Sequence, residues 1–189
     1  NVELIAIADN NCSDTIVKEV LVGTIPNSTI SISGNTSFCD GDSSILSVPY
    51  NGNYNYLWKL NSVNLTGATN DSLIINTNSG NYTVEVTNPV GNCVSTSSSV
   101  PITVNPTPVV PDITTDDEIT FCRGDSAVLI NDLVGATWLK NGANIAINTG
   151  AFIAKSEGIY QVKYTNSSNC TGYSNTIELT VYDIPSIPA

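Results

Sequence analysis

The sequence predicts an all-β fold, and three observations support that prediction. Short segments in which apolar and polar residues alternate recur along the chain, as at residues 44–48, 72–75, 82–87 and 177–181. A period of two is the signature of a half-buried strand. Gly, Asn and Pro interrupt these segments at intervals of roughly ten residues, which is typical of a β-sandwich or barrel. No part of the chain shows a sustained period of 3.6, so the sequence predicts no amphipathic helix.

One turn can be predicted in detail. Asn141 and Gly142 stand between the segments 138–140 and 143–145. A two-residue hairpin of type I′ needs positive φ at both central residues, and Asn-Gly tolerates this better than other pairs. We therefore expect a tight hairpin here.

The chain contains an internal repeat. Four landmarks occur twice in the same order, with a spacing that shrinks from 83 to 77 residues, as shortening loops would produce. Because four landmarks in one order rarely recur by chance, the sequence predicts two complete modules of roughly 80 residues each. The paired landmarks are residues 38–43 with 121–126, Trp58 with Trp138, 79–84 with 157–162, and 92–93 with 169–170.

The first 25 residues match only the last part of this repeat pattern. Residues 1–7 alternate as 82–86 do, and Asn11-Cys12 matches Asn92-Cys93. We therefore interpret this segment as the end of a preceding module, whose first cysteine would lie upstream. Proline-rich segments, which act as semi-rigid spacers, separate the parts. The predicted divisions are 1–25 for the preceding repeat, 26–106 and 107–184 for the complete modules, and 185–189 for the start of a further linker.

Composition excludes several classes of function. The 189 residues include no His, 17 Asp and Glu against 6 Lys and Arg, and a formal charge of −11. Without imidazole there is no Ser-His-Asp triad and no His-based metal site. With a single arginine, Arg123, a phosphate-neutralising nucleic-acid surface is not expected. No apolar run approaches the roughly 18 residues of a membrane span. We expect no cofactor and no catalytic residue.

Each complete module carries a Trp, a later Gly-x-Tyr and two flanking cysteines. These landmarks favour an immunoglobulin-like sandwich. On this basis we expect Trp58 and Trp138 to lie in the two cores. Tyr82 and Tyr160 are expected to be corner tyrosines that tie a turn to the sheet.

The same landmarks resemble a known group of repeats. Phe-Cys-x-Gly-Asp-Ser, then Trp with Asn-Gly, then Ser-Gly-x-Tyr-x-Val-x-Val-Thr-Asn, then Asn-Cys is similar to the Ig-like repeats of secreted Bacteroidota cell-surface proteins. These include the giant gliding-motility adhesins, where such repeats often stand beside PKD-type domains. Residues 1–25 resemble the tail of a PKD-type repeat equally well. The resemblance implies export through the type IX route and an extracellular, outer-membrane-attached location.

The cysteines depart from the antibody pattern, in which the second cysteine lies two residues after the corner tyrosine. Here Val84 and Val162 occupy that position, and the cysteine follows later. Because each module carries one cysteine of each type, we predict the disulfides Cys39–Cys93 and Cys122–Cys170, with Cys12 unpaired in this chain. Disulfides indicate an oxidising, extracellular compartment.

Two side-chain groups are weak candidates for a ligand site. Oxygen ligands suit Ca²⁺, and the acids that follow the second proline-rich segment could supply them, although most such clusters are solvated surface. Rigid aromatic rings among small amides are typical of ligand loops, and Tyr50 and Tyr54 precede Trp58 in such a setting, although an ordinary hairpin explains them too. The acidic candidates are Asp112, Asp116, Asp117 and Glu118.

The tripeptide at residues 123–125, Arg-Gly-Asp, spells an integrin-binding motif. Residues 40–42 of the first module read Asp-Gly-Asp in the same repeat position. A turn built on Gly, with Asp and Ser bonding the local main chain, explains both segments. Asp40 and Asp42 are equally weak candidates for a Ca²⁺ ligand.

The sequence therefore predicts a structural or adhesive segment of a large extracellular filament or adhesin. Its expected partners are neighbouring modules of the same chain, surface polysaccharide or other cell-surface proteins. The alternative is an accessory carbohydrate-binding or spacer module of a secreted enzyme. Tandem modules reach outward without an active site, and avidity can replace affinity.

Overall fold

The computed structural model describes residues 1–147 and 150–185, and its regular secondary structure in these ranges is β-strand apart from one turn of 3-10 helix. It divides into two compact units, Asn1–Val104 and Asn105–Ala189, which we describe one at a time. Past Pro185, the linker predicted at 185–189 lies outside the described residues. Within the described ranges, no helix has the length and apolar character needed to cross a bilayer.

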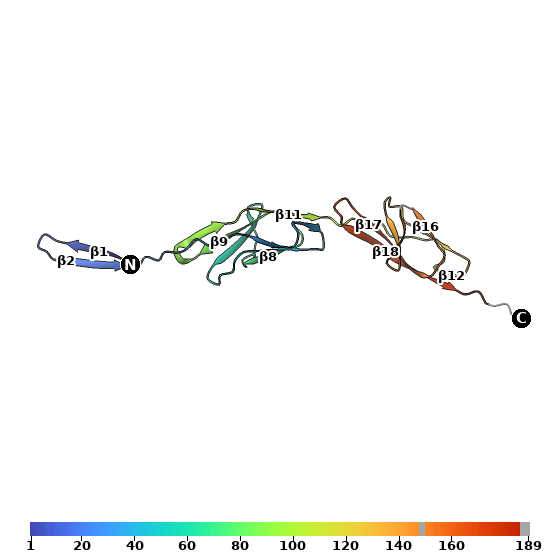
Figure 1. Cartoon of the computed structure of the whole chain (residues 1–189), viewed down its shortest axis with the longest axis horizontal. Helices are drawn as coiled ribbons and strands as arrows, with labels where there is room; N and C mark the ends of the chain where they lie inside the picture. Colours follow the sequence, from blue (N-terminus) through green and yellow to red (C-terminus); the bar gives the residue numbers. More distant parts are fainter. Residues whose placement is uncertain (148–149, 186–189) are drawn as a thin grey trace. The chain divides into compact units, whose positions relative to one another are not determined.

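The first unit begins with an antiparallel hairpin of strands β1 (Val2–Ile7) and β2 (Ser13–Lys18) (Figure 1). Its turn is closed by two main-chain bonds: the Ala8 amide donates to the Cys12 carbonyl, and the Asn11 amide donates to the Ala8 carbonyl. Asn11 adopts a φ of 67°, a left-handed conformation that Asn tolerates better than most residues.

Two sheets form the rest of the first unit. The larger sheet has the order β4-β11-β9-β6-β7, with β10 also paired to β9, and the smaller has the order β3-β5-β8. A single turn of 3-10 helix, η1 (Val90–Asn92), connects β9 to β10. The strands are β3 (Ser31–Ser33), β4 (Ser37–Cys39), β5 (Ser44–Ser47), β6 (Asn55–Leu60), β7 (Val63–Asn64), β8 (Ser72–Ile75), β9 (Gly80–Asn88), β10 (Cys93–Thr96) and β11 (Val100–Asn105).

The second unit repeats this layout. Its larger sheet has the order β12-β18-β17-β14-β15, with β12 parallel to β18, and β13 pairs with β16 in the smaller one. A bridge from Thr114 to Ile130 takes the place of β3. Both modules are therefore Ig-like β-sandwiches, as the sequence predicts. The strands are β12 (Thr120–Cys122), β13 (Ala127–Ile130), β14 (Thr137–Lys140), β15 (Ala143–Ile147), β16 (Ala151–Ala154), β17 (Gly158–Thr165) and β18 (Thr171–Tyr182).

Each module has its own core between its two sheets. Trp58 and Trp138 are fully buried, each on the strand next to the central one of its larger sheet. The Trp58 indole N–H donates to the Asn70 carbonyl at 2.9 Å, so its polar atom is satisfied inside the core. The first core also contains Phe38, Leu46, Val48, Tyr56, Ile75, Tyr82, Val84, Val86 and Ile102. The second also contains Val110, Ile113, Ala127, Leu129, Ala136, Ala154, Tyr160, Val162 and Leu179.

A buried tyrosine ties the turn before the central strand of each module. The Tyr82 hydroxyl donates to the Asn78 carbonyl at 2.7 Å, and the Tyr160 hydroxyl donates to the Ser156 carbonyl at 2.8 Å. Each bond joins residues four apart, so it fixes the corner at which the chain enters β9 or β17. Both rings are almost completely buried.

We expect Tyr82→Phe to lower the free energy of unfolding of the first module by about 1–2 kcal/mol, because the Asn78 carbonyl loses its buried donor. Burial also raises the pKa of the Tyr82 hydroxyl above 10.0. The stability linked to this shift is complete below pH 10 and declines as the pH rises through the folded-state pKa, because the unfolded chain ionises first. Urea titrations of both forms between pH 7 and 11 test this. A wild-type slope above pH 10 that persists in Tyr82→Phe would assign it to other groups.

The predicted Asn-Gly hairpin is confirmed. Lys140 pairs with Ala143, and the two central residues, Asn141 and Gly142, have φ values of 50° and 80°. The first module makes the same turn with Asn61 and Ser62, at φ values of 49° and 70°. Serine is not a typical residue for the second position of this turn, so the pair Asn61-Ser62 does not by itself indicate a hairpin.

The two predicted disulfides within the modules are wrong. Cys93 and Cys122 carry free thiols, as Cys12 does, whereas Cys39 and Cys170 are disulfide-bonded. Strand register explains why Cys122 and Cys170 do not pair, because Cys122 lies opposite the last residue of β18, whereas Cys170 directly precedes its first residue. At a rise of about 3.3 Å per residue, the two ends of that strand lie roughly 36 Å apart. A disulfide requires Cα atoms within about 7 Å.

Candidate functional site

The acidic residues proposed for calcium do not form a metal site in the described part of the chain, where no group of three or more potential ligands is found. Two of these carboxylates accept hydrogen bonds from main-chain amides instead. Asp112 Oδ1 accepts the Asn175 amide at 3.3 Å, and Asp117 Oδ2 accepts the Val128 amide at 2.6 Å. These carboxylates therefore connect neighbouring segments of the second module. Asp116 and Glu118 are exposed.

The tyrosine loop of the first module offers only one open ring. Tyr50 is 74% exposed, whereas Tyr54 packs partly against the core and its hydroxyl lies 3.4 Å from the Thr24 hydroxyl. Tyr56, a buried residue of the first core, fixes the loop: its hydroxyl oxygen accepts the Asn51 main-chain amide at 2.7 Å. The loop is thus attached to the core through Tyr56, and Tyr50 is its exposed aromatic ring.

The Arg-Gly-Asp turn is also occupied by local contacts. Arg123 Nε and Nη2 both contact Asp183 Oδ1, at 2.7 and 2.6 Å. The Asp125 amide donates to the Cys122 carbonyl at 3.1 Å, and Gly124 has a φ of 111°, which only glycine adopts readily. The tight turn accounts for the glycine, and the ion pair accounts for the arginine.

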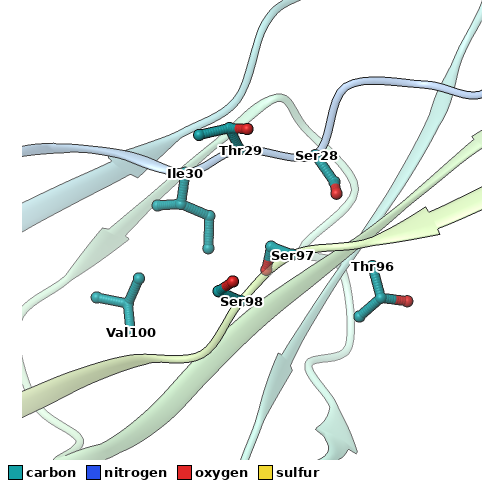
Figure 2. Close-up of a pocket in the computed structure, with 7 residues that line it drawn as sticks. All are labelled: Ser28, Thr29, Ile30, Thr96, Ser97, Ser98 and Val100. Carbon is teal, nitrogen blue, oxygen red and sulfur yellow. The ribbon is translucent and has the colours of Figure 1, made fainter.

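The structure reveals a cleft in the first module that sequence reasoning missed. It has a volume of about 250 Å³ and lies between the segment leading into β3 and the segment joining β10 to β11 (Figure 2). Figure 2 shows the Ser28 and Ile30 side chains pointing into this gap from one side, with Ser98 and Val100 opposite. Five hydroxyl side chains line the cleft, Ser28, Thr29, Thr96, Ser97 and Ser98, together with the apolar Ile30 and Val100.

A break in the last strand opens one wall of this cleft. The Ser97 side-chain oxygen takes the place of a main-chain acceptor and binds the Val84 amide at 3.0 Å. Regular pairing resumes at Val100, which lies opposite Tyr82. Between these points the pairing with β9 is interrupted, and residues 98 and 99 are exposed. A bulge of this kind redirects side chains at a sheet edge.

The second module has the same break but closes it. The Ser174 hydroxyl oxygen accepts the Val162 amide at 2.9 Å, so Ser174 is the counterpart of Ser97. The next residue, Asn175, reaches across the gap: its Oδ1 accepts the Ile113 amide at 2.6 Å and its Nδ2 donates to the Ile113 carbonyl at 3.2 Å. One carboxamide therefore joins the two segments at this position. In the first module the nearest side-chain bond between them lies further along, between the Ser28 and Ser95 hydroxyl groups at 2.9 Å.

An asparagine in each module binds the segment that leads into that module. Asn88 Nδ2 donates to the Thr24 carbonyl at 3.0 Å, and Asn166 Nδ2 donates to the Pro106 carbonyl at 3.0 Å. Each asparagine also accepts the amide of a residue two positions later through its Oδ1, at 3.0 Å. The asparagine is thus fixed by its own turn and presents its amide to the incoming chain.

Comparison with known proteins gives a likeness of fold only. No family model matches the chain, and no curated protein matches it. A fragment with three N-terminal domains of the highly immunogenic outer capsid protein (Hoc) of bacteriophage RB49 is 16% identical, with a TM-score of 0.39. That match covers 82% of this chain, which spans 59% of the length of the fragment.

Two further structures are similar at the same level. A mouse coronavirus receptor-binding domain complexed with its murine receptor gives 17% identity and a TM-score of 0.36, covering 80% of this chain and 100% of that one. An I-band fragment of titin gives 11% identity and a TM-score of 0.39, covering 85% and 67%. At these identities and TM-scores the matches support no functional argument. The assignment of Ig-like modules follows from the strand order described above.

Proposed function

We propose that this chain is a structural and adhesive segment of a long extracellular surface protein built from tandem Ig-like modules. The observation that supports this most directly is the attachment of the incoming chain in both modules. Asn88 and Asn166 bond the main chain that precedes their own sandwich, at Thr24 and Pro106. A module that uses a side chain to hold the segment before it is suited to a position within an array.

The first hairpin supports the same proposal. Its turn is closed by the same pattern of two main-chain bonds as the turn between β17 and β18. There, the Asn166 amide donates to the Cys170 carbonyl and the Asn169 amide donates to the Asn166 carbonyl. Asn11 and Asn169 both have positive φ, at 67° and 62°. We propose that residues 1–25 are the final hairpin of a preceding module.

The finer assignment rests on the motif resemblance and on compartment chemistry. We propose an adhesin of the secreted Bacteroidota type, such as those used in gliding, that is exported by the type IX route and displayed on the outer surface. The disulfide-bonded state of Cys39 and Cys170 supports an oxidising environment. The partners would be adjacent modules and surface polysaccharide or protein, and no catalytic role is proposed.

Single-molecule stretching tests the structural role. With the chain tethered at residues 26 and 185 under reducing conditions, we expect two separate unfolding events, one for each module. Each event should release about 80 residues, a contour length of roughly 28 nm at ~3.5 Å per residue. Extension without force peaks would contradict a load-bearing role.

A second candidate function is an accessory carbohydrate-binding or spacer module of a secreted enzyme. The hydroxyl-lined cleft of the first module favours it, because hydroxyl groups both donate and accept hydrogen bonds, as sugars do. Binding of a soluble glycan without adhesion of protein-coated beads to surfaces would favour this function over the adhesive one.

A further inference from the structure

The cleft of the first module lies where the second module holds a carboxamide. The two positions are equivalent, because Ser97 and Ser174 make the same bond to the central strand of their own modules. The next residue is Ser98 in the first module and Asn175 in the second. On the other wall, Ser31 pairs with Ser47 as Thr114 pairs with Ile130, which makes Ile30 the counterpart of Ile113.

The two modules differ in what fills the gap. In the second module the side-chain carboxamide of Asn175 forms hydrogen bonds with both the main-chain N–H and the main-chain carbonyl of Ile113, and Ile113 is 2% exposed. A serine side chain is one bond shorter and carries one polar atom, so it cannot donate and accept across the same distance. No hydrogen bond joins Ser98 to Ile30 among the residues that the structure describes, and Ile30 is only partly buried.

We propose that the cleft of the first module binds the acetamido group of an N-acetylated sugar. The amide of that group occupies the place of the Asn175 carboxamide and makes the paired bonds to the Ile30 main chain. Its methyl group contacts the Ile30 and Val100 side chains, the two apolar residues of the cleft. This proposal rests on the cleft alone and holds for an adhesin and for an accessory module alike.

The lining of the cleft favours a sugar over a peptide side chain. Beyond the amide position, the walls present the hydroxyl groups of Thr96 and Ser97. The Ser97 oxygen accepts the Val84 amide, so its hydroxyl hydrogen is left to donate to a ligand. Hydroxyl groups match the alternating donors and acceptors around a sugar ring. An asparagine or glutamine of another protein would satisfy the amide position but would leave these groups unused. The volume of about 250 Å³ is below the range of about 300–1,000 Å³ typical of sites for larger ligands, and it suits one ring.

Amide NMR spectra of the full chain provide the test, with N-acetylglucosamine as ligand and glucose as the matched control. We expect N-acetylglucosamine to shift the resonances of residues 28–30 and 96–100 with a dissociation constant of about 1–10 mM, since one ring makes few contacts. Glucose should cause no such shifts. Ser98→Asn should close the cleft and weaken binding at least ten-fold, whereas Ser98→Ala, which leaves it open, should keep binding within about three-fold, because a neutral hydrogen bond contributes little net free energy.

The reverse substitution in the second module gives an independent test of the proposal. Asn175→Ser should open the second module and add shifts at residues 111–113 and 174–177 with the same sugar. The proposal is overturned if N-acetylglucosamine causes no shifts in the wild type, if glucose matches it, or if Ser98→Asn binds as well as the wild type. Stronger shifts with the tripeptide Gly-Asn-Gly than with the sugar would also overturn it, in favour of a peptide ligand. None of these outcomes bears on the stretching experiment, so the two proposals fail separately.

Discussion

Trp58→Ala is expected to lower the free energy of unfolding of the first module by about 3–5 kcal/mol, the usual cost of removing a large buried aromatic side chain. The Trp58 ring is fully buried, and its indole N–H satisfies the Asn70 carbonyl inside the fold. Domains are stable by about 5–15 kcal/mol, so this loss removes a large share of the stability of the first module and moves its unfolding to lower urea. The second module has its own core and should stay folded.

The chain is well suited to this measurement because it contains only two tryptophans. In Trp58→Ala, fluorescence reports only on Trp138 and therefore on the second module, while far-ultraviolet circular dichroism reports on both. We expect an unchanged urea midpoint by fluorescence and an early transition by circular dichroism. Val63→Ala, at a position 69% exposed, is the control and should change stability by less than about 0.5 kcal/mol. A shift of the fluorescence midpoint would show that the two cores are energetically coupled.

Sequence patterns predict this core well because hydrophobic burial repeats with the modules. Trp58 and Tyr82 stand in a fixed order among the other landmarks, and both modules keep this order although loop lengths change the spacing by a few residues. Alternation places Val84 and Val86 on one face of their strand, and both are fully buried. Period and turn chemistry are local properties, so a single sequence is enough to show them.

The disulfides could not be predicted in the same way, because pairing depends on which ends of the strands lie together. A pairing based on one cysteine of each type per module takes no account of strand direction, which decides how far apart the two cysteines lie. Cys122 lies beside Tyr182 at one end of the longest strand, and Cys170 lies at the other. The parallel pairing of β12 with β18 fixes this arrangement, and no pattern in either segment indicates it.

A finer comparison of the two repeats reveals the residue exchange at the cleft, but not the cleft itself. Serine stands at both bulge positions, Ser97 and Ser174, and the difference lies one residue later, at Ser98 and Asn175. In a chain with 24 Asn and 21 Ser, such an exchange is unremarkable until the structure shows the Asn175 amide bridging to Ile113. The chemistry of the site depends on a contact between segments 62 residues apart.

A large effect of a single methyl group is expected at Gly172, the second residue of β18. A Cβ built on this glycine overlaps the carbonyl oxygen of Pro108 and also approaches the Val110 side chain, at 3.2 Å. The obstacle is main chain, so a change of rotamer cannot relieve it. Gly172→Ala should therefore displace the segment that leads into the second module and pull Val110, only 7% exposed, out of the core.

We expect Gly172→Ala to destabilise the second module by about 2–4 kcal/mol, because the burial of Val110 contributes about 1.5–3 kcal/mol and the Asn166 bond to Pro106 adds about 1 kcal/mol. Gly150→Ala in the same module is the matched control, because among the described residues the nearest atom to its Cβ is Asp132 Oδ1, at 3.8 Å. It should be neutral or stabilising by up to about 1 kcal/mol, since alanine restricts the unfolded chain. Urea unfolding followed by Trp138 fluorescence in a Trp58→Phe background compares the two. Equal midpoints would mean that the incoming segment adds nothing to the stability of the sandwich it is bound to, and the case for a module built to be preceded by another would lose its main support.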